Sequence, residues 1–321
     1  MKKITTLLAC FLLLGTFAKA QQDAMFTKYM FNSLSYNPAY AGSKEHMSLG
    51  LLHRSQWVGI EGAPQTQSFT MHTPLSNNRV GIGMNIMNDK IGPSNNLFVG
   101  LDYAYRIKIG SGKLSLGLQG SIENWRADWT LLSTEDVFDP EFNTNPNNWL
   151  PNFGAGLYYY TKVFYLGASV PKLIQNDLTP AGEKNNFFVN KGRRHYYLTG
   201  GVAIPLNGED LILRPSMLVK SVGIFDEEIN APTEFDVDVS LLFYQTFWVG
   251  VSFRSAFDFK NSSNDSVDFW ASYNLPNGLT IGAAFDYTLT KLESVAKGSF
   301  ELMVGYEFDY KTKRTVTPRY F

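Results

Sequence analysis

The sequence is poor in the residues on which most enzymes and most small secreted domains depend. A single cysteine, Cys10, occurs among 321 residues, and it lies in a leader that is expected to be removed. The mature chain should therefore contain no disulfide, thiolate metal site or cysteine nucleophile. The four histidines form no HExxH or paired metal spacing, and no GxSxG motif occurs. These absences predict a protein that is not an enzyme and needs no cofactor.

Long apolar runs are missing as well. After residue 20 no stretch of 18 or more apolar residues occurs, so no transmembrane helix is expected in the mature chain. Yet 44% of the residues are hydrophobic and 15% are aromatic, and only 18% are charged. In lipid, only helices and closed barrels satisfy every backbone polar group. A membrane protein of this composition is therefore predicted to be a β-barrel.

The first twenty residues have the pattern of a secretory signal. Two lysines precede the apolar run Leu7–Leu14, and an A-x-A site ends at Ala20. A lipoprotein with acylated Cys10 is the alternative, but the apolar run continues past this cysteine, which favours cleavage after Ala20. Cleavage would leave 25 basic and 29 acidic residues, a net charge of −4. This charge gives no reason to expect nucleic-acid binding.

Alternation of apolar with small or polar residues runs through the rest of the chain. In Leu279–Leu289 it lasts about ten residues, which is roughly the length a tilted strand needs to cross a bilayer. The turn Asn277-Gly278 precedes it and supplies the positive φ angles of a tight hairpin. Fourteen such stretches are predicted: Met47–Gln56, Gln65–Thr73, Arg79–Asn88, Asn96–Ile107, Lys113–Glu123, Asn152–Tyr160, Val163–Val170, His195–Pro205, Asp210–Ser221, Thr233–Phe243, Phe247–Phe257, Val267–Leu275, Leu279–Leu289 and Gly298–Phe308.

The connections between these stretches alternate between short and long. Short periplasmic turns and longer external loops are typical of outer-membrane barrels. The long loops are expected at Trp57–Pro64, Asp89–Asn95, Ala127–Pro151, Pro171–Arg194, Val222–Pro232, Asp258–Ser266 and Thr290–Lys297. The predicted fold is an all-β transmembrane antiparallel barrel of about 14 strands over residues 47–310. A signal peptide (1–20) and an N-terminal segment (21–46) precede it, and a basic tail (311–321) follows. The expected location is the outer membrane of a Gram-negative bacterium.

Strand parity separates residues that face lipid from residues that face the lumen. If the apolar set faces lipid, as in outer-membrane barrels, the polar set faces inward. Charges of both signs then lie inside, which favours internal ion pairs over selectivity for one ion sign. Glycines also recur on the inner parity and leave room for something to approach the wall, or allow the wall to coil. The charged lumen residues are predicted to be Asp102, Arg106, Arg214, Asp236, Asp238, Arg254, Asp286, Glu301 and Glu307.

The N-terminal segment is rich in aromatic residues but does not alternate cleanly. Five aromatics in 23 residues should not stand unpaired in water. Two interpretations remain open: a plug that packs its aromatics in the lumen, and an ordered periplasmic lead-in to the first strand. This segment resembles the opening of the PorP/SprF family of outer-membrane proteins of type IX secretion and gliding motility. The resemblance rests on Met25-Phe26-Thr27, Tyr29-Met30-Phe31-Asn32, Asn37-Pro38-Ala39-Tyr40-Ala41-Gly42-Ser43 and Arg54-Ser55-Gln56-Trp57.

The resemblance implies a barrel that helps to export or anchor a cognate cell-surface protein, such as an adhesin, through that protein's C-terminal sorting domain. Expected partners are this client, secretion or gliding components, and the lipid bilayer, with lipopolysaccharide as a further candidate and no nucleic acid. The alternative is a plugged channel for small or hydrophobic molecules. Partner contacts are hypothesised at Phe26, Tyr29, Phe31, Asn32, Asn37, Pro38, Tyr40, Arg54, Gln56, Trp57, Phe187, Phe188, Arg193 and Arg194.

Two other segments carry open alternatives. The loop Thr134–Asn148 offers acidic and amide oxygens at alternating spacing, which could hold calcium, but it lacks the glycine-bearing order of an EF-hand. It is more simply read as a polar external loop. The tail Lys311–Phe321 is basic and ends in an aromatic residue. It could extend the wall or hang into the periplasm and bind an acidic partner.

Overall fold

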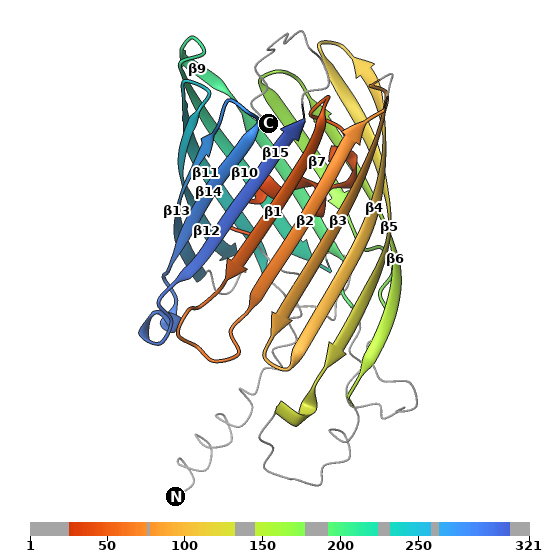
Figure 1. The fold of residues 1–321 in the computed structure, drawn as a ribbon, viewed down its shortest axis with the longest axis vertical. Coiled ribbons are helices and arrows are strands. Elements are labelled where there is room, and N and C mark those ends of the chain that lie inside the picture. The colour runs from red at the N-terminus through yellow and green to blue at the C-terminus, as the bar shows by residue number, and fades with distance from the viewer. Residues whose placement is uncertain are drawn as a thin grey trace, which may run out of the picture.

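The computed structural model describes residues 26–75, 78–131, 145–176, 192–223, 232–257 and 263–308. Within these ranges, fifteen strands form one antiparallel sheet, which closes into a barrel because β1 pairs with β15 as well as with β2 (Figure 1). The strands are β1 (Met47–Ser55), β2 (Gln65–Pro74), β3 (Val80–Ile91), β4 (Ser94–Ile109), β5 (Gly112–Ala127), β6 (Asn147–Tyr160), β7 (Phe164–Val170), β8 (His195–Val202), β9 (Ile204–Asn207), β10 (Leu211–Val222), β11 (Thr233–Phe243), β12 (Phe247–Phe257), β13 (Ser263–Asn274), β14 (Leu279–Thr288) and β15 (Ser299–Phe308).

The fifteen strands correspond to fourteen membrane-spanning positions in the barrel, because β8 and β9 are two halves of one span. Both pair with β10, and only Ala203 separates them. Ala203 is buried against Ile212 and Leu242, so the break in the strand turns a small side chain inward. The predicted antiparallel barrel of about 14 strands is confirmed.

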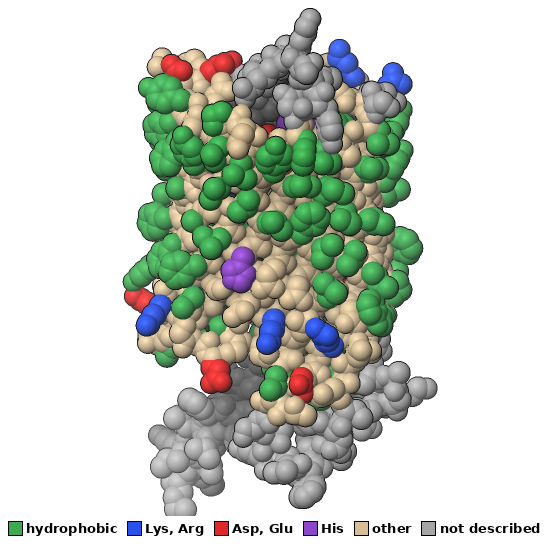
Figure 2. All heavy atoms as spheres, in the orientation of Figure 1, with side chains coloured by type: hydrophobic (Ala, Val, Ile, Leu, Met, Phe, Trp, Pro, Cys, Tyr) green, Lys and Arg blue, Asp and Glu red, His purple; other side chains and the backbone are tan. Residues whose placement is uncertain are grey.

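Apolar side chains face outward and charged ones face inward, the reverse of a soluble sheet. On β11, Val237 is 44% exposed whereas Asp238 is fully buried. Apolar side chains cover the visible outer wall, and charged ones gather toward its two ends (Figure 2). A strand sends alternate side chains to opposite faces, so the period of two in the sequence becomes a lipid-facing surface and a polar lumen. No helix in the described residues is long and apolar enough to cross a membrane.

Several predicted boundaries were wrong, and the largest differences lie at the end of the barrel that carries the long loops. The expected loop Asp89–Asn95 is a tight turn, because Gly92 adopts a φ of +53° and lets β3 pair with β4 up to Ile91 and Ser94. Strand β6 begins at Asn147 and not at Asn152, and β13 begins at Ser263 and not at Val267. The added residues of β13 are all polar, and those of β6 combine asparagine and proline with Trp149 and Leu150, so neither shows the apolar alternation from which a strand could be inferred.

Residues 26–46 lie inside the barrel and are called the inner segment below. Three short helices form most of it, namely η1 (Tyr29–Asn32), α2 (Ser33–Tyr36) and η2 (Pro38–Tyr40), drawn in red within the barrel in Figure 1. Its first described residues contact Arg54, near the long-loop end of β1, whereas Lys44 contacts Glu307 at the short-turn end. The inner segment therefore runs along the lumen from the long-loop half to the short-turn end, where β1 begins.

Candidate functional site: the inner segment and its two walls

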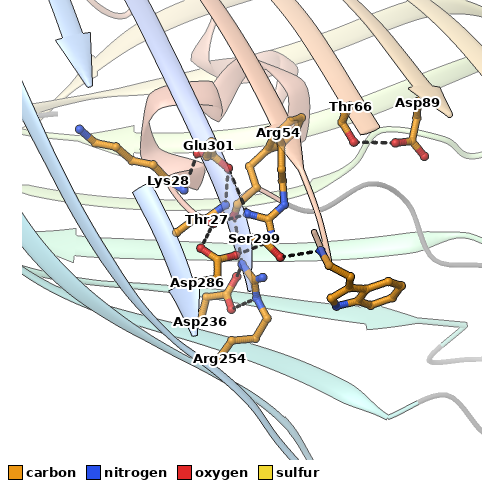
Figure 3. A network of polar contacts seen from close by, with 12 residues as sticks. Thr27, Lys28, Arg54, Thr66, Asp89, Asp236, Arg254, Asp286, Ser299 and Glu301 are labelled. Carbon is orange, nitrogen blue, oxygen red and sulfur yellow. Dashed lines mark hydrogen bonds and ion pairs between the residues drawn. The ribbon is translucent and has the colours of Figure 1, made fainter. Parts of the chain in front are cut away.

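The first contact between the inner segment and the barrel is a buried ionic network. The backbone N–H groups of Thr27 and Lys28 donate to the two carboxylate oxygens of Glu301, at 2.8 and 3.1 Å. Arg54 pairs with Asp286 at 2.6 Å and with Glu301 at 3.3 Å, and the Thr27 hydroxyl donates to Asp286 at 2.5 Å (Figure 3). Arg54 also contacts the Thr27 hydroxyl oxygen. One arginine thus links the wall to the segment.

A second arginine repeats this arrangement. The Arg254 guanidinium donates to both oxygens of Asp236, at 2.7 and 3.3 Å, and to the carbonyl oxygen of Phe26 at 3.1 Å. A buried charge is costly unless it is paired and hydrogen-bonded, and here the backbone of the segment supplies part of the pairing. We call Arg54, Asp236, Arg254, Asp286 and Glu301 the charged wall; they come from β1, β11, β12, β14 and β15.

Lys28 lies fully buried beside this wall. Its ammonium donates to the Ser272 hydroxyl at 2.9 Å and lies 4.0 Å from the ring centroid of Trp270. Burial, and secondarily the nearby Arg214, lower the pKa of Lys28 from 10.5 to about 7. Aromatic faces, the Ser272 hydroxyl and the nearby carboxylates of Asp238 and Glu301 stabilise the charged form of Lys28.

The opposite side of the inner segment rests on glycines. A Cβ at Gly117 would lie 2.1 Å from the backbone nitrogen of Ala39, and one at Gly81 would lie 2.1 Å from the carbonyl oxygen of Ala41. A Cβ at Gly156 would lie 2.1 Å from the side-chain oxygen of Asn37. We call Gly81, Gly117 and Gly156 the glycine wall. Only hydrogen at these positions lets η2 and the residues on either side of it lie directly on the sheet.

Asn37 fastens the segment to the glycine wall. Its side-chain oxygen accepts from the backbone N–H of Ala39 at 2.9 Å and caps η2, while its amide donates to the carbonyl oxygen of Leu157 at 2.9 Å. Pro38 follows at the first helical position, where its fixed φ suits a helix start. Arg106 completes the attachment by donating to the carbonyl oxygen of Ala41 at 2.7 Å.

Aromatic side chains fill the space between the two walls. Tyr36 packs edge-on against Phe26, with ring centroids 6.0 Å apart, and against Tyr197 at 5.2 Å. Tyr40 lies edge-on to Tyr158 at 5.4 Å, and the Tyr29 hydroxyl donates to Ser216 at 2.8 Å. Most aromatics of this segment are therefore buried in a polar-lined lumen.

The predicted lumen charges all lie on the inner side of the strands, but in different settings. Asp102 is held by the amides of Asn85 and Gln119, at 3.0 and 2.7 Å, and Arg106 binds carbonyl oxygens. Glu307 lies at the short-turn end, where its side chain is 43% exposed and paired with Lys44 at 2.8 Å. The buried members are Asp102, Arg106, Arg214, Asp236, Asp238, Arg254, Asp286 and Glu301.

The hypothesised partner contacts fall into two groups. Those of the inner segment, together with Arg54, are turned into the lumen, so a partner outside the barrel would not meet them: Phe26, Tyr29, Phe31, Asn32, Asn37, Pro38 and Tyr40. Gln56 and Trp57 open the loop after β1, and Arg194 is exposed at the same end. Arg193 is half-buried, and Phe187 and Phe188 lie outside the described residues.

Most of the proposed calcium loop also lies outside the described residues. At its described edge, Asn145 accepts from the Trp129 N–H at 2.8 Å and donates to Asp128 at 3.1 Å. Within the part of the chain that the structure describes, no group of three or more His, Cys, Asp or Glu side chains could hold a metal ion. The leader, residues 1–20, and the tail, residues 311–321, are likewise not described.

Sequence reasoning missed several residues that hold the inner segment. Ser216, Trp248 and Trp270 all contribute contacts, yet none of the three stood out in the sequence. The inner-parity glycines and the aromatic residues of the N-terminal segment were the available signals. They pointed to something close to the wall without identifying it.

A closed barrel with an apolar exterior, charged interior and ordered inner segment defines an outer-membrane β-barrel protein. The family model described as "Type IX secretion system membrane protein PorP/SprF" matches residues 18–306. The chain therefore belongs to the PorP/SprF family. No curated protein matches it.

Several solved outer-membrane proteins are similar to this chain at very low sequence identity. The outer membrane protein Omp33 of Acinetobacter baumannii has 9% identity and a TM-score of 0.45, covering 82% of this chain and 99% of that one. A FadL homologue of Pseudomonas aeruginosa has 12% identity and a TM-score of 0.44, covering 82% and 89%. The KdgM porin has 11% identity and a TM-score of 0.38, covering 82% and 99%. Likeness at this level carries no argument about function.

Proposed function

We propose that this barrel helps to export or anchor a cognate cell-surface protein of the type IX system, gripping that protein's C-terminal sorting domain. The observation that carries the proposal is the inner segment that braces the lumen of a PorP/SprF barrel. The inner segment makes hydrogen bonds to side chains or carbonyls of β1, β2, β4, β6, β7, β10 and β12 to β15. A barrel braced across its interior is a rigid mount.

A braced lumen leaves the two rims for partners. At the long-loop end, Trp57 and Arg194 offer an aromatic and a cationic side chain. At the short-turn end, Tyr244 is 73% exposed in the three-residue connection from β11 to β12, in which both Tyr244 and Gln245 have positive φ. In this proposal the client contacts the external rim, and secretion or gliding components contact the periplasmic rim.

Co-purification from native membranes followed by mass spectrometry tests the proposal. A secreted protein with a type IX C-terminal domain should co-purify with the wild-type barrel. An Arg194→Met variant should lose part of this client, while a Lys108→Met variant, altered at the opposite end, should retain it. A deletion strain that still displays all its surface adhesins and moves normally would contradict the proposal.

Planar-bilayer recording distinguishes the rigid mount from the alternative of a plugged channel. A braced mount should be electrically silent. Steady conductance that rises when residues 26–43 are deleted, without any co-purifying client, would favour a plugged channel.

A further inference from the structure

A cavity of about 760 Å³ lies between the inner segment and the short-turn end. Exposed residues of the turns, including Glu209, Asp210 and Tyr244, line its mouth, whereas Leu34 and Leu242 are buried in its wall. Short turns mark the periplasmic end of outer-membrane barrels, so the cavity is reached from the periplasm. A cavity of this volume has room for several side chains of another segment.

The exposed charges at this end are separated by sign along the rim. Glu209 and Asp210 lie in the connection from β9 to β10, whereas Lys108 lies on β4 and Lys162 in the connection from β6 to β7. On the face shown in Figure 2, acidic side chains lie at one side of this end and basic ones at the other. Glu209 accepts from the Gln245 amide at 3.0 Å, and among the described residues no cation pairs with Glu209 or Asp210. The acidic side of the mouth therefore offers two carboxylates without a counter-charge.

The other charged groups of the cavity do not compete for these carboxylates. Glu307 pairs with Lys44 at 2.8 Å and with His46 at 3.1 Å. Lys28 and Arg214 are almost fully buried in the floor. A cationic segment that enters from the periplasm therefore meets free carboxylates at the mouth, and an apolar and aromatic wall beside them.

The basic tail Lys311–Phe321 follows the strand that forms part of this mouth. Tyr306 and Glu307 of β15 line the cavity, and β15 ends at Phe308. The tail contains four basic residues and no acidic one, and its last two residues are aromatic. Its charge is complementary to the acidic side of the mouth, and its aromatic residues match the wall. A segment attached beside its site has a millimolar effective concentration, so weak individual contacts suffice to hold it there.

The tail is long enough to reach the acidic side of the mouth. Strand β10, which follows Asp210, lies five strands from β15, and neighbouring strands are about 4.8 Å apart, which gives about 24 Å along the wall. An extended chain advances about 3.3 Å per residue. Arg314 and Arg319 can therefore reach about 20 and 36 Å from Phe308, which brackets the distance required.

We propose that the basic tail folds back over the mouth of its own barrel. Its lysine and arginine side chains lie beside Glu209 and Asp210, and Tyr320 and Phe321 lie on the apolar wall of the cavity. This placement leaves the basic side of the rim open to periplasmic partners. The inference goes beyond the proposed function and does not depend on it, because it concerns a contact within one chain.

Disulfide formation in nanodiscs that hold a single barrel tests the placement of the tail. No cysteine occurs after residue 20, so an introduced pair supplies the only thiols of the purified mature chain. With copper phenanthroline as oxidant, Asn207→Cys should form a disulfide with Thr317→Cys roughly tenfold faster than Ser111→Cys does. Ser111 is the matched control, because it is a polar, exposed turn residue at the same end and follows β4, four strands from β15. An unrestrained tail would meet it as readily as Asn207.

Charge reversal tests the ion pairs. In the Asn207→Cys/Thr317→Cys chain, Glu209→Lys/Asp210→Lys should slow disulfide formation about fivefold, the effect of losing two exposed ion pairs. Salt at 1 M should slow it as well, because it screens exposed charges. Adding Lys313→Glu/Arg314→Glu to the reversed chain should restore the rate, which a misfolded rim would not allow.

Alkylation of a thiol in the cavity tests the position of the aromatic residues. Thr280 lines the cavity, so Thr280→Cys should react slowly with a polar maleimide while the tail covers it. Tyr320→Ser/Phe321→Ser should speed this reaction roughly tenfold, since the apolar contact is lost. Heat-modifiable migration on a gel reports whether each variant is folded. Equal disulfide rates at Asn207 and Ser111, a rate insensitive to charge reversal, or an unchanged alkylation rate in folded Tyr320→Ser/Phe321→Ser would overturn the proposal.

Discussion

The charged wall and the glycine wall hold the same inner segment by opposite means. At the charged wall, side chains reach across and pair with backbone groups of residues 26–28. At the glycine wall, side chains are absent and the backbone of residues 37–41 lies on the sheet. A charge can be replaced by an isosteric neutral group and leave its space intact, whereas a glycine cannot gain a side chain without moving a backbone. Mutations should therefore act differently at the two walls: a new side chain at the glycine wall should disturb folding, and a lost charge at the charged wall should lower the free energy of unfolding.

The largest effect is expected at the glycine wall. In Gly117→Val, the new side chain would occupy the space of the Ala39 backbone, so either the inner segment leaves the wall or the barrel does not close. We expect a large loss of the heat-modifiable folded form, and increased conductance in whatever barrel does fold.

Gly120 on the same strand provides the matched control. A Cβ there would meet nothing within 4 Å, so Gly120→Val should fold like wild type. If Gly117→Val were equally harmless, the close approach of η2 to β5 would be wrong.

At the charged wall, removing one member of an ion pair should lower the free energy of unfolding strongly. Removing both members should lower it by less than the sum of the two single losses. Arg54→Met leaves Asp286 and Glu301 buried without their cation, which should lower the free energy of unfolding by about 3–5 kcal/mol. In the double variant Arg54→Met/Glu301→Gln, one of the stranded charges is also removed, so the loss should be smaller than the sum of the single losses. Urea titration in lipid measures each value.

An exposed pair on the same barrel gives the contrast. Lys113 and Glu45 are 2.6 Å apart, but each side chain is about one-third exposed. Glu45→Gln should cost at most about 1 kcal/mol. An equal cost at both pairs would mean that burial is not what makes the charged wall important.

The two walls also differ in how far the sequence could predict them. Strand parity placed Asp236, Arg254 and Glu301 on the inner face, because a period of two is visible in any alternating strand. It could not show that Arg54 would meet both Asp286 and Glu301, since that depends on the register closing β1 onto β15. Gly117 and Ala39 are 78 positions apart in the sequence, and their close contact depends on the missing side chain of Gly117. No local sequence pattern encodes such a contact. The resemblance of the N-terminal motif marked the segment but not its place in the lumen.

Lys28 lies at the edge of the charged wall and should make the stability of the folded protein depend on pH. Its pKa is lowered to about 7 in the folded chain, chiefly by burial, with Arg214 lowering it further and Asp238 and Glu301 raising it. Between about pH 7 and 10.5 the unfolded chain then binds more protons at Lys28 than the folded chain, so stability rises with pH in that window. We expect the wild type to gain about 1 kcal/mol relative to Lys28→Met between pH 7 and 8. Urea titrations at the two pH values measure this gain, and parallel pH profiles for the two proteins would contradict it.

An effect much smaller than that of Arg54→Met is expected between the two walls, at Tyr29. Its hydroxyl donates to Ser216 at 2.8 Å, and its ring is buried among the aromatics of the lumen. Tyr29→Phe removes one neutral hydrogen bond and keeps the packing, so it should cost about 0.5–1.5 kcal/mol, measured by the same urea titration. Tyr29→Ala, which also removes the ring, should cost several times more because it opens a cavity. If Tyr29→Phe cost as much as Arg54→Met, the hold on the inner segment would depend on the middle of the lumen and not on its two walls.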